Sequence, residues 1–221
     1  QNTDIQEIKA EKYIQMSATM SHDIKLNYKY SLTRAIQEEV ISDYRLGIVY
    51  LTEGDTIKAS CEYVCEHPEL YPLQLFCNSQ ERVKESYKFI NKYKPKDGRK
   101  KLVVKYVLGE MNSKEKEKVR LGIENDDVDI IIVCQCFSVG TDMRRLKTTF
   151  MLDKKTTKQS LIQASLRCLR KHELKSHGNI FIPVHHKESE YYSPEDSKDL
   201  AFLISCLQEE DDRLNDKSFM R

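Results

Sequence analysis

Residues 128–134 read VDIIIVC, and every side chain in this stretch except that of Asp129 is apolar. Successive side chains of a β-strand point to opposite faces of the sheet, so an apolar run without alternation predicts a strand that is buried on both faces. Such strands lie in parallel sheets whose two faces are covered by helices. The stretch therefore predicts an α/β fold with a parallel sheet.

Strand and helix patterns alternate on both sides of this stretch. Further strands are expected at 45–52, 73–77, 101–108, 149–152 and 179–184. The clearest helical pattern between them runs to Glu124 and begins with Asn112 and Glu115, the two residues of a capping box. Alternation at this spacing is typical of a parallel sheet flanked by helices on both faces.

Composition limits the classes of protein to which the chain can belong. The 221 residues are 39% hydrophobic and 32% charged, as in a globular protein of one large or two small domains. No apolar run has membrane-spanning length, and QNTDIQEIKAEK at the start does not resemble a signal peptide. A start on Gln rather than Met leads us to expect a fragment of a longer protein. The formal net charge of +1 gives no global attraction to nucleic acid, so any such contact must come from local patches.

The seven cysteines indicate a reduced intracellular compartment, cytoplasmic or nuclear, because most of them lie within apolar runs. Cys61 and Cys65 with His67 could suggest a zinc site. No second Cys/His pair lies at finger-like spacing, so a helix or loop explains these residues better. We expect no metal site within this chain.

Residues 161–170, LIQASLRCLR, are predicted to form one helix with a narrow polar face. Gln163, Arg167 and Arg170 stand at i, i+4 and i+7 and share that face, while the other faces are almost entirely apolar. Two guanidinium groups side by side suit phosphate oxygens. The alternative is a pair of structural arginines that bind carboxylates or helix ends, which the helix considered alone would favour.

Polar residues are also expected where strands end. Asn78 and Ser79 follow the strand at 73–77, and Gly140 and Asp142 follow the one at 128–134. In open parallel sheets ligands bind beyond the carboxyl ends of the strands, and the helix with the arginines starts after another such end. Gly140 would bring backbone close to a phosphate or ribose, and Asp142 would accept a hydrogen bond from a hydroxyl. A tight turn capped by the aspartate is the alternative.

Several of these segments, in this order, resemble motifs of superfamily 2 (DEAD/DEAH-like) helicases. Gln163, Arg167 and Arg170 match the Q-x-x-G-R-x-x-R pattern of motif VI, and residues 137–143, FSVGTDM, resemble motif V. The tripeptide at 17–19, Ser-Ala-Thr, resembles motif III, although a strand that stops at a hydroxyl-rich turn would read the same way. The resemblance covers about 12–172. Residues 28–44, YKYSLTRAIQEEVISDY, and 75–85, LFCNSQERVKE, are similar to helicases of large DNA viruses and restriction-type translocases, which would make a viral factory one cytoplasmic location.

This resemblance implies that residues 23–221 form the C-terminal RecA-like helicase domain, and that 1–22 are the end of the preceding RecA-like domain and a linker. The sequence contains no Gly-rich P-loop and no Asp-Glu pair after a strand. ATP and Mg²⁺ would therefore be bound mainly by the N-terminal RecA-like domain of the same protein, and this chain alone would be inactive as an ATPase. DNA or RNA would be the other partner, and no membrane is expected.

The resemblance also assigns roles to individual residues. Gln163, Arg167 and Arg170 would contact the γ-phosphate, with Arg170 as the arginine finger, and Gly140 and Asp142 would lie at the nucleotide edge. Ser17 and Thr19 would couple hydrolysis to movement along the nucleic-acid strand. A loose match to motif IV would place three further residues on the nucleic-acid side: Asn78, Ser79 and Gln80.

Three positions depart from the family pattern. Leu166 stands where motif VI has Gly, and Val139 and Arg144 replace a Glu and a Pro often found around motif V. A branched side chain at 166 needs room next to the arginines. The alternative function is therefore kept open: a non-catalytic RecA-like module that binds nucleic acid or protein, whose arginines hold another phosphate or a carboxylate partner.

Overall fold

A six-stranded parallel sheet forms the centre of the protein, as the apolar run at 128–134 predicted. The computed structural model describes residues 28–52, 56–95, 98, 100–134, 142–153, 158–186 and 194–215. The strand order is β1-β6-β5-β2-β4-β3, and every neighbouring pair is parallel. The strands are β1 (Asp43–Thr52), β2 (Leu73–Cys77), β3 (Val104–Val107), β4 (Ile130–Cys134), β5 (Thr148–Met151) and β6 (His177–His186).

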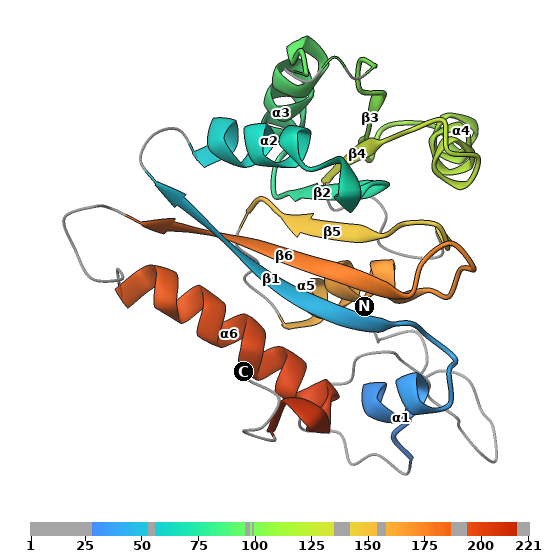
Figure 1. Ribbon diagram of the computed structural model, residues 1–221, viewed down its shortest axis with the longest axis vertical. Helices are drawn as coiled ribbons and strands as arrows, with labels where there is room; N and C mark the ends of the chain where they lie inside the picture. Colours follow the sequence, from blue (N-terminus) through green and yellow to red (C-terminus); the bar gives the residue numbers. More distant parts are fainter. Residues whose placement is uncertain are drawn as a thin grey trace, which may run out of the picture.

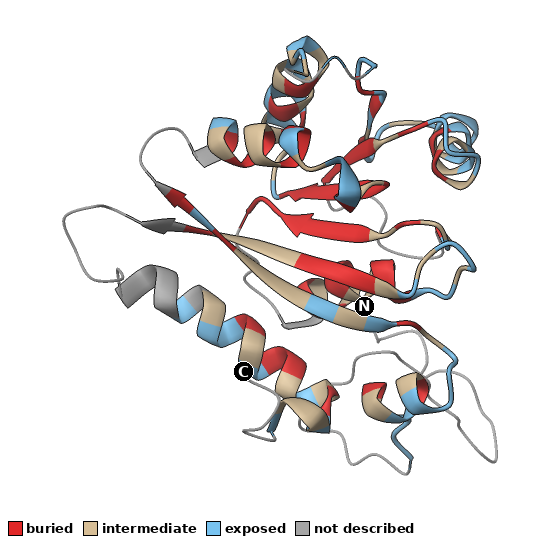
Figure 2. Ribbon diagram, in the orientation of Figure 1, coloured by how far each residue is buried: buried red, intermediate tan, exposed pale blue. Residues whose placement is uncertain are grey.

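The predicted central strand is β4, which lies between β2 and β3 with all five residues buried. The strands β2, β4 and β5 are buried along most of their length, whereas the edge strand β1 is partly exposed (Figure 2). The arrows of β1, β5 and β6 point the same way (Figure 1), and β2, β4 and β3 continue the sheet in parallel pairs. The carboxyl ends of the strands therefore form one edge of the sheet and the amino ends the opposite edge.

Helices cover both faces of the sheet. The α-helices are α1 (Leu32–Gln37), α2 (Thr56–Glu66), α3 (Gln80–Lys92), α4 (Ser113–Glu124), α5 (Lys158–Ser165) and α6 (Pro194–Glu210). Three short 3₁₀-helices are η2 (Pro68–Leu70), η3 (Leu166–Leu169) and η4 (Asp212–Asn215). Apolar residues of α2 and α3 share one core cluster with one face of the strands, and those of α1, α4, α5 and α6 share a second cluster with the other face.

Local sequence signals set several helix starts. Asn112 and Glu115 form the predicted capping box of α4, with both hydrogen bonds 2.9 Å long. Ser79 caps α3 by accepting from the backbone N–H of Arg82 at 3.2 Å. These caps satisfy backbone donors that the first helical turn leaves without a partner.

The prediction of one continuous helix over 161–170 is wrong. The α-helix α5 ends at Ser165, the chain tightens into η3, and Arg170 leaves η3 in an extended conformation with ψ 133°. The carbonyl of Leu169 accepts from the backbone N–H of Ser42 at 2.7 Å, and that of Cys168 accepts from Lys175 at 2.8 Å. Outside donors occupy the carbonyls that residues 172 and 173 would use in a longer helix, and Arg170 already lies outside η3. The predicted i, i+4, i+7 face therefore does not form.

The expectation that the arginines lie at the carboxyl edge is also wrong. Helix α5 begins at that edge, after β5, and runs back across the sheet behind β1 and β6 (Figure 1). Residues 158–169 span about 18 Å or more, whereas the four residues of β5 span about 13 Å. Arg170 therefore lies beside Ile41, just before β1, at the amino edge of the sheet.

Candidate functional site

Two of the predicted site residues, Arg170 and Asp142, meet at the amino edge of the sheet, so the expectation that Asp142 lies at the carboxyl edge is wrong as well. The Nε atom of Arg170 lies 3.3 Å from Oδ1 of Asp142, and the Nε–H of Arg144 donates to Oδ2 at 3.0 Å. The side chains of Arg170 and Asp142 remain 54% and 40% exposed. The carboxylate is thus shared by two arginines in a position that solvent, or a ligand, can reach.

Helix α4 holds the Asp142 segment in place. A terminal nitrogen of Arg120 donates to the backbone carbonyl of Asp142 at 3.2 Å. Arg145, three residues further on, pairs with Asp126 at 2.7 Å, just after the end of α4. Both contacts lie near the start of β4, so they fix the segment at the amino edge, where Arg170 lies.

Arg167 is the second arginine of this site and has an unusual environment. Its Nε atom is buried without a hydrogen-bond partner, and no carboxylate pairs with its guanidinium among the described residues. Burial, together with the positive charge of Arg170, lowers the pKa of Arg167 to about 10. A buried charge that lacks a counter-charge is costly, so an anion placed here would be stabilised by both arginines. Gln163, the third residue of the predicted stripe, is half-buried on α5.

Lys175 is a site residue that the sequence did not reveal. It lies in the loop before β6, and its ammonium donates to the carbonyls of Leu146 and Cys168 at 2.7 and 2.8 Å. Burial lowers the pKa of Lys175 to about 8. The surrounding sequence reads ELKSHG, an ordinary polar loop, and gives no signal of a partly buried lysine.

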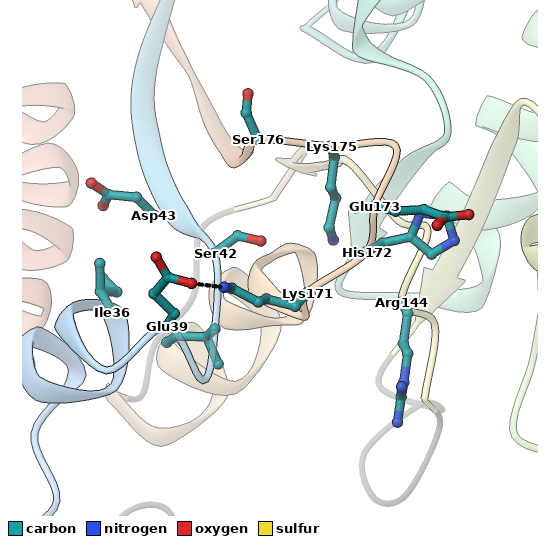
Figure 3. Close-up of a pocket in the computed structure, with 11 residues that line it drawn as sticks. Ile36, Glu39, Ser42, Asp43, Arg144, Lys171, His172, Glu173, Lys175 and Ser176 are labelled. Atoms are coloured by element: carbon teal, nitrogen blue, oxygen red, sulfur yellow. Dashed lines mark hydrogen bonds and ion pairs between the residues drawn. The ribbon is translucent and has the colours of Figure 1, made fainter.

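A cavity of about 720 Å³ adjoins these residues at the amino edge. Figure 3 shows Arg144 and Lys175 on one side of it and the ion pair between Lys171 and Glu39, 2.9 Å long, on the other. The lining mixes both signs of charge. The full lining is Ile36, Glu39, Ile41, Ser42, Asp43, Arg144, Lys171, His172, Glu173, Lys175 and Ser176.

The predicted residues after β2 lie at the opposite, carboxyl edge. Asn78 and Gln80 are exposed, and the hydroxyl of Ser79 is used as the cap of α3. Asp153, which the sequence reading did not single out, orders this turn. Its buried carboxylate accepts from the backbone N–H of Asn78 at 2.7 Å and from the guanidinium of Arg82 at 2.5 Å. Its place directly after the strand at 149–152 was the available signal.

Three of the predicted residues, Ser17, Thr19 and Gly140, lie outside the described residues. Within the described ranges, no group of three or more His, Cys, Asp and Glu side chains could hold a metal ion. No helix in the same ranges is long and apolar enough to span a membrane.

Comparison with solved structures identifies the fold. The ATP-dependent Type ISP restriction-modification enzyme LlaBIII bound to DNA gives a TM-score of 0.66 at 15% identity, over 85% of this chain and 15% of that chain. A DEAD box protein from the hyperthermophile Methanococcus jannaschii gives 0.53 at 17% identity, over 78% and 41%. The C-terminal domain of the DEAD-box protein Dbp5 gives 0.54 at 13% identity, over 76% and 84%. The chain thus spans well under two thirds of the first two proteins.

The family model of the helicase conserved C-terminal domain matches residues 56–172, more than half of the chain. No protein of curated function matches the sequence, and the resemblance to helicases of large DNA viruses stays a prediction. The matched region runs from α2 through β2, β4 and β5 to the arginine segment. This chain belongs to the helicase C-terminal domain family, and it has the RecA-like α/β fold of superfamily 2 helicases.

Proposed function

We propose that this chain is the C-terminal motor domain of an ATP-dependent nucleic-acid helicase or translocase. In this proposal residues 23–221 form the motor domain, and residues 1–22 carry motif III and join it to the preceding RecA-like domain. That preceding domain makes most of the contacts to ATP and Mg²⁺, while this chain supplies Arg170 as the arginine finger. The chain is inactive as an ATPase by itself.

The observation that carries the proposal is the unpaired guanidinium of Arg167 beside Arg170. A structural arginine would be expected to have a carboxylate partner, and Arg167 has none among the described residues. Oδ1 of Asp142 is likewise buried without a hydrogen bond. The unpaired guanidinium of Arg167 and the carboxylate of Asp142, whose Oδ1 makes an ion pair with Arg170 but no hydrogen bond, fit a ligand that has both an anionic group and a hydroxyl, as the triphosphate and ribose of ATP do.

Bound ATP would supply the γ-phosphoryl group that is transferred to water. Charge develops on the oxygens of this group during transfer, and preorganised cations stabilise it. Arg167 and Arg170 present two such cations, with Gln163 before them on the same segment. Asp142 would accept from a ribose hydroxyl, and Gly140 would lie near it. Arg170 leaves Asp142 to reach the phosphate, and the half-exposed position of both side chains leaves space for that movement.

DNA or RNA would run along the opposite edge of the sheet. Asn78, Ser79 and Gln80 lie there in the turn that Asp153 orders. Ser17 and Thr19 would couple hydrolysis to movement along one strand. In this arrangement nucleotide and nucleic acid contact opposite edges of one rigid sheet, so a rotation of the domain on hydrolysis would shift the nucleic-acid edge.

The test uses the protein that contains both RecA-like domains. Arg170→Ala is expected to lower ATP turnover about a thousandfold, the scale of an arginine finger, with circular dichroism unchanged. Arg144→Ala is the matched control, because Arg144 binds the same carboxylate but is 67% exposed and lies outside motif VI. We expect its effect to stay below about tenfold. ATP turnover near the wild-type rate in Arg170→Ala would contradict the proposal.

The second candidate is a RecA-like module that binds nucleic acid or protein without catalysis. The ion pair between Arg170 and Asp142 is the observation that favours it, because a structural arginine would make such a contact. Turnover unaffected by the double change Arg167→Ala and Arg170→Ala would support this candidate. It does not account for the unpaired guanidinium of Arg167.

A further inference from the structure

The ammonium of Lys175 joins two segments that are distant in sequence. One carbonyl that it binds belongs to Leu146, in the segment of Asp142 and Arg144. The other belongs to Cys168, between Arg167 and Arg170. The two bonds, 2.7 and 2.8 Å long, are charge-assisted and therefore stronger than bonds from a neutral donor.

Lys175 occupies an unfavourable place for a lysine, which argues for a specific role. Its side chain is partly buried, and this burial disfavours the charged form. The charged groups that face it are Glu124 from α4, Asp142 and Arg170, and the thiol of Cys168 lies against it. The positive charge of Arg170 lowers the pKa of Lys175, whereas the carboxylates of Glu124 and Asp142 raise it.

The two carbonyls are close in sequence to the groups of the candidate site. Leu146 lies four residues after Asp142, and Cys168 lies two residues before Arg170. On its other side η3 is held by the hydrogen bond from Ser42 to Leu169. Fixing both carbonyls with one ammonium therefore sets the separation between the carboxylate and the arginines. A misplacement of about 1 Å in such a site can lower a rate about a hundredfold.

We propose that Lys175 is a positioning residue that ties the Asp142 segment to the arginine segment and so holds both in the geometry that receives the nucleotide. This inference rests on the proposed function and extends it to a residue outside the helicase motifs. Lys175 acts through its two carbonyl contacts and needs no contact with ATP.

Because Lys175 is charged, its two hydrogen bonds to the carbonyls of Leu146 and Cys168 depend on pH. Loss of the proton at a pKa of about 8 weakens both hydrogen bonds, so kcat/KM, which reports the free enzyme, is expected to fall as pH rises through 8. Stability is expected to change in the opposite direction. The pKa is about 10.5 in the unfolded chain, which therefore binds more protons between pH 8 and 10.5, and folding becomes more favourable across that window.

The experiment compares Lys175→Met, Lys175→Arg and wild type in the protein with both RecA-like domains. We expect Lys175→Met to lower kcat/KM for ATP about a hundredfold. Lys175→Arg, which stays charged, should restore it to within about tenfold of wild type and move the alkaline fall above pH 9. Lys171→Met is the matched control: Lys171 lies in the same loop and makes only an exposed pair with Glu39.

Three results would overturn the inference. Wild-type kcat/KM in Lys175→Met while Arg170→Ala is inactive would refute the tie and leave the proposed function standing. An unchanged alkaline fall in Lys175→Arg would refute it even if Lys175→Met failed to fold. Full activity of Arg170→Ala would refute the proposed function, and the positioning role of Lys175 with it.

Discussion

The Nε atom of Arg170 lies 3.3 Å from Oδ1 of Asp142, so the residue expected to act as arginine finger is paired with the residue expected to face the ribose. Both side chains are about half exposed. Ion pairs of this kind contribute about 1 kcal/mol or less, because water competes for both charges. A phosphate group, with more charge and three acceptor oxygens, can therefore displace the carboxylate. The ion pair with Asp142 therefore leaves Arg170 able to bind a phosphate.

The carboxylate of Asp142 is expected to distinguish nucleotides by their ribose hydroxyls. Wild type should prefer ATP over 2′,3′-dideoxy-ATP by about tenfold to a hundredfold in kcat/KM, the effect of one hydrogen bond to a charged group. Asp142→Asn should lose most of this preference. Asp126→Asn is the control, because Asp126 is an exposed partner of another arginine, Arg145. The assignment of Asp142 to the ribose is wrong if the preference is the same in Asp142→Asn and wild type.

The two roles of Ser79 can be separated by substitution. Its hydroxyl caps α3, so Ser79→Ala should lower the free energy of unfolding by about 1 kcal/mol in urea titrations. Ser79→Asp keeps a good cap and should unfold like wild type. The added negative charge should still weaken binding of single-stranded nucleic acid, and more strongly at low salt, if Ser79 faces the phosphate backbone. Unchanged binding in Ser79→Asp would remove Ser79 from the nucleic-acid side.

Short-range signals in the sequence predicted much of the fold. The apolar run at 128–134 requires burial on both faces, and it forms β4, which lies between β2 and β3 in the sheet. The pair Asn112 and Glu115 acts within one helical turn, so its capping box did not depend on the rest of the chain. The alternation of strands and helices predicted the parallel sheet because each of these patterns is likewise set by residues close in sequence.

The arginine segment could not be predicted in this way, because contacts distant in sequence decide it. The carbonyls of Cys168 and Leu169 accept from Lys175 and Ser42, and these bonds take up the acceptors that a helix extending past Arg170 would use. Hydrophobic periodicity does not report such donors. It also does not show that the helical segment at 158–169 is longer than the strand β5 before it. This difference in length brings Arg170 back to the amino edge.

Leu166, which replaces the motif glycine, is expected to matter for stability and not for ATP binding. Its side chain is partly buried and packs against the core cluster to which α5 contributes. Leu166→Gly should lower the free energy of unfolding by about 2–4 kcal/mol, from lost burial and the greater freedom of glycine in the unfolded chain. The KM for ATP, measured where the variant remains folded, should stay within about threefold of wild type. A clear fall in KM would mean that Leu166 obstructs the nucleotide.

Asp211 anchors the end of α6 to the edge strand. Its carboxylate, which has no exposed surface, accepts from Thr33 at 2.8 Å, from Tyr44 at 2.9 Å and from Arg213 at 2.7 Å. Arg213 also binds Asp43 at 2.9 Å. Burial acts to raise the pKa of Asp211, but the three hydrogen-bond donors outweigh it and hold the pKa below its usual value of 3.8.

The lowered pKa predicts how stability depends on pH. Below pH 4 the unfolded chain takes up a proton at this position before the folded protein does, so the contribution of Asp211 is complete above about pH 4 and is lost as pH falls through the folded pKa. Asp211→Asn should lower the free energy of unfolding by about 3 kcal/mol at pH 7, because it leaves Arg213 without its buried partner. The difference from wild type should shrink between pH 4 and pH 2. Glu39→Gln, which breaks the exposed pair with Lys171, should cost less than about 1 kcal/mol at every pH. A loss in Asp211→Asn that stays constant down to pH 2 would show that the charge of Asp211 is not what stabilises this corner of the fold.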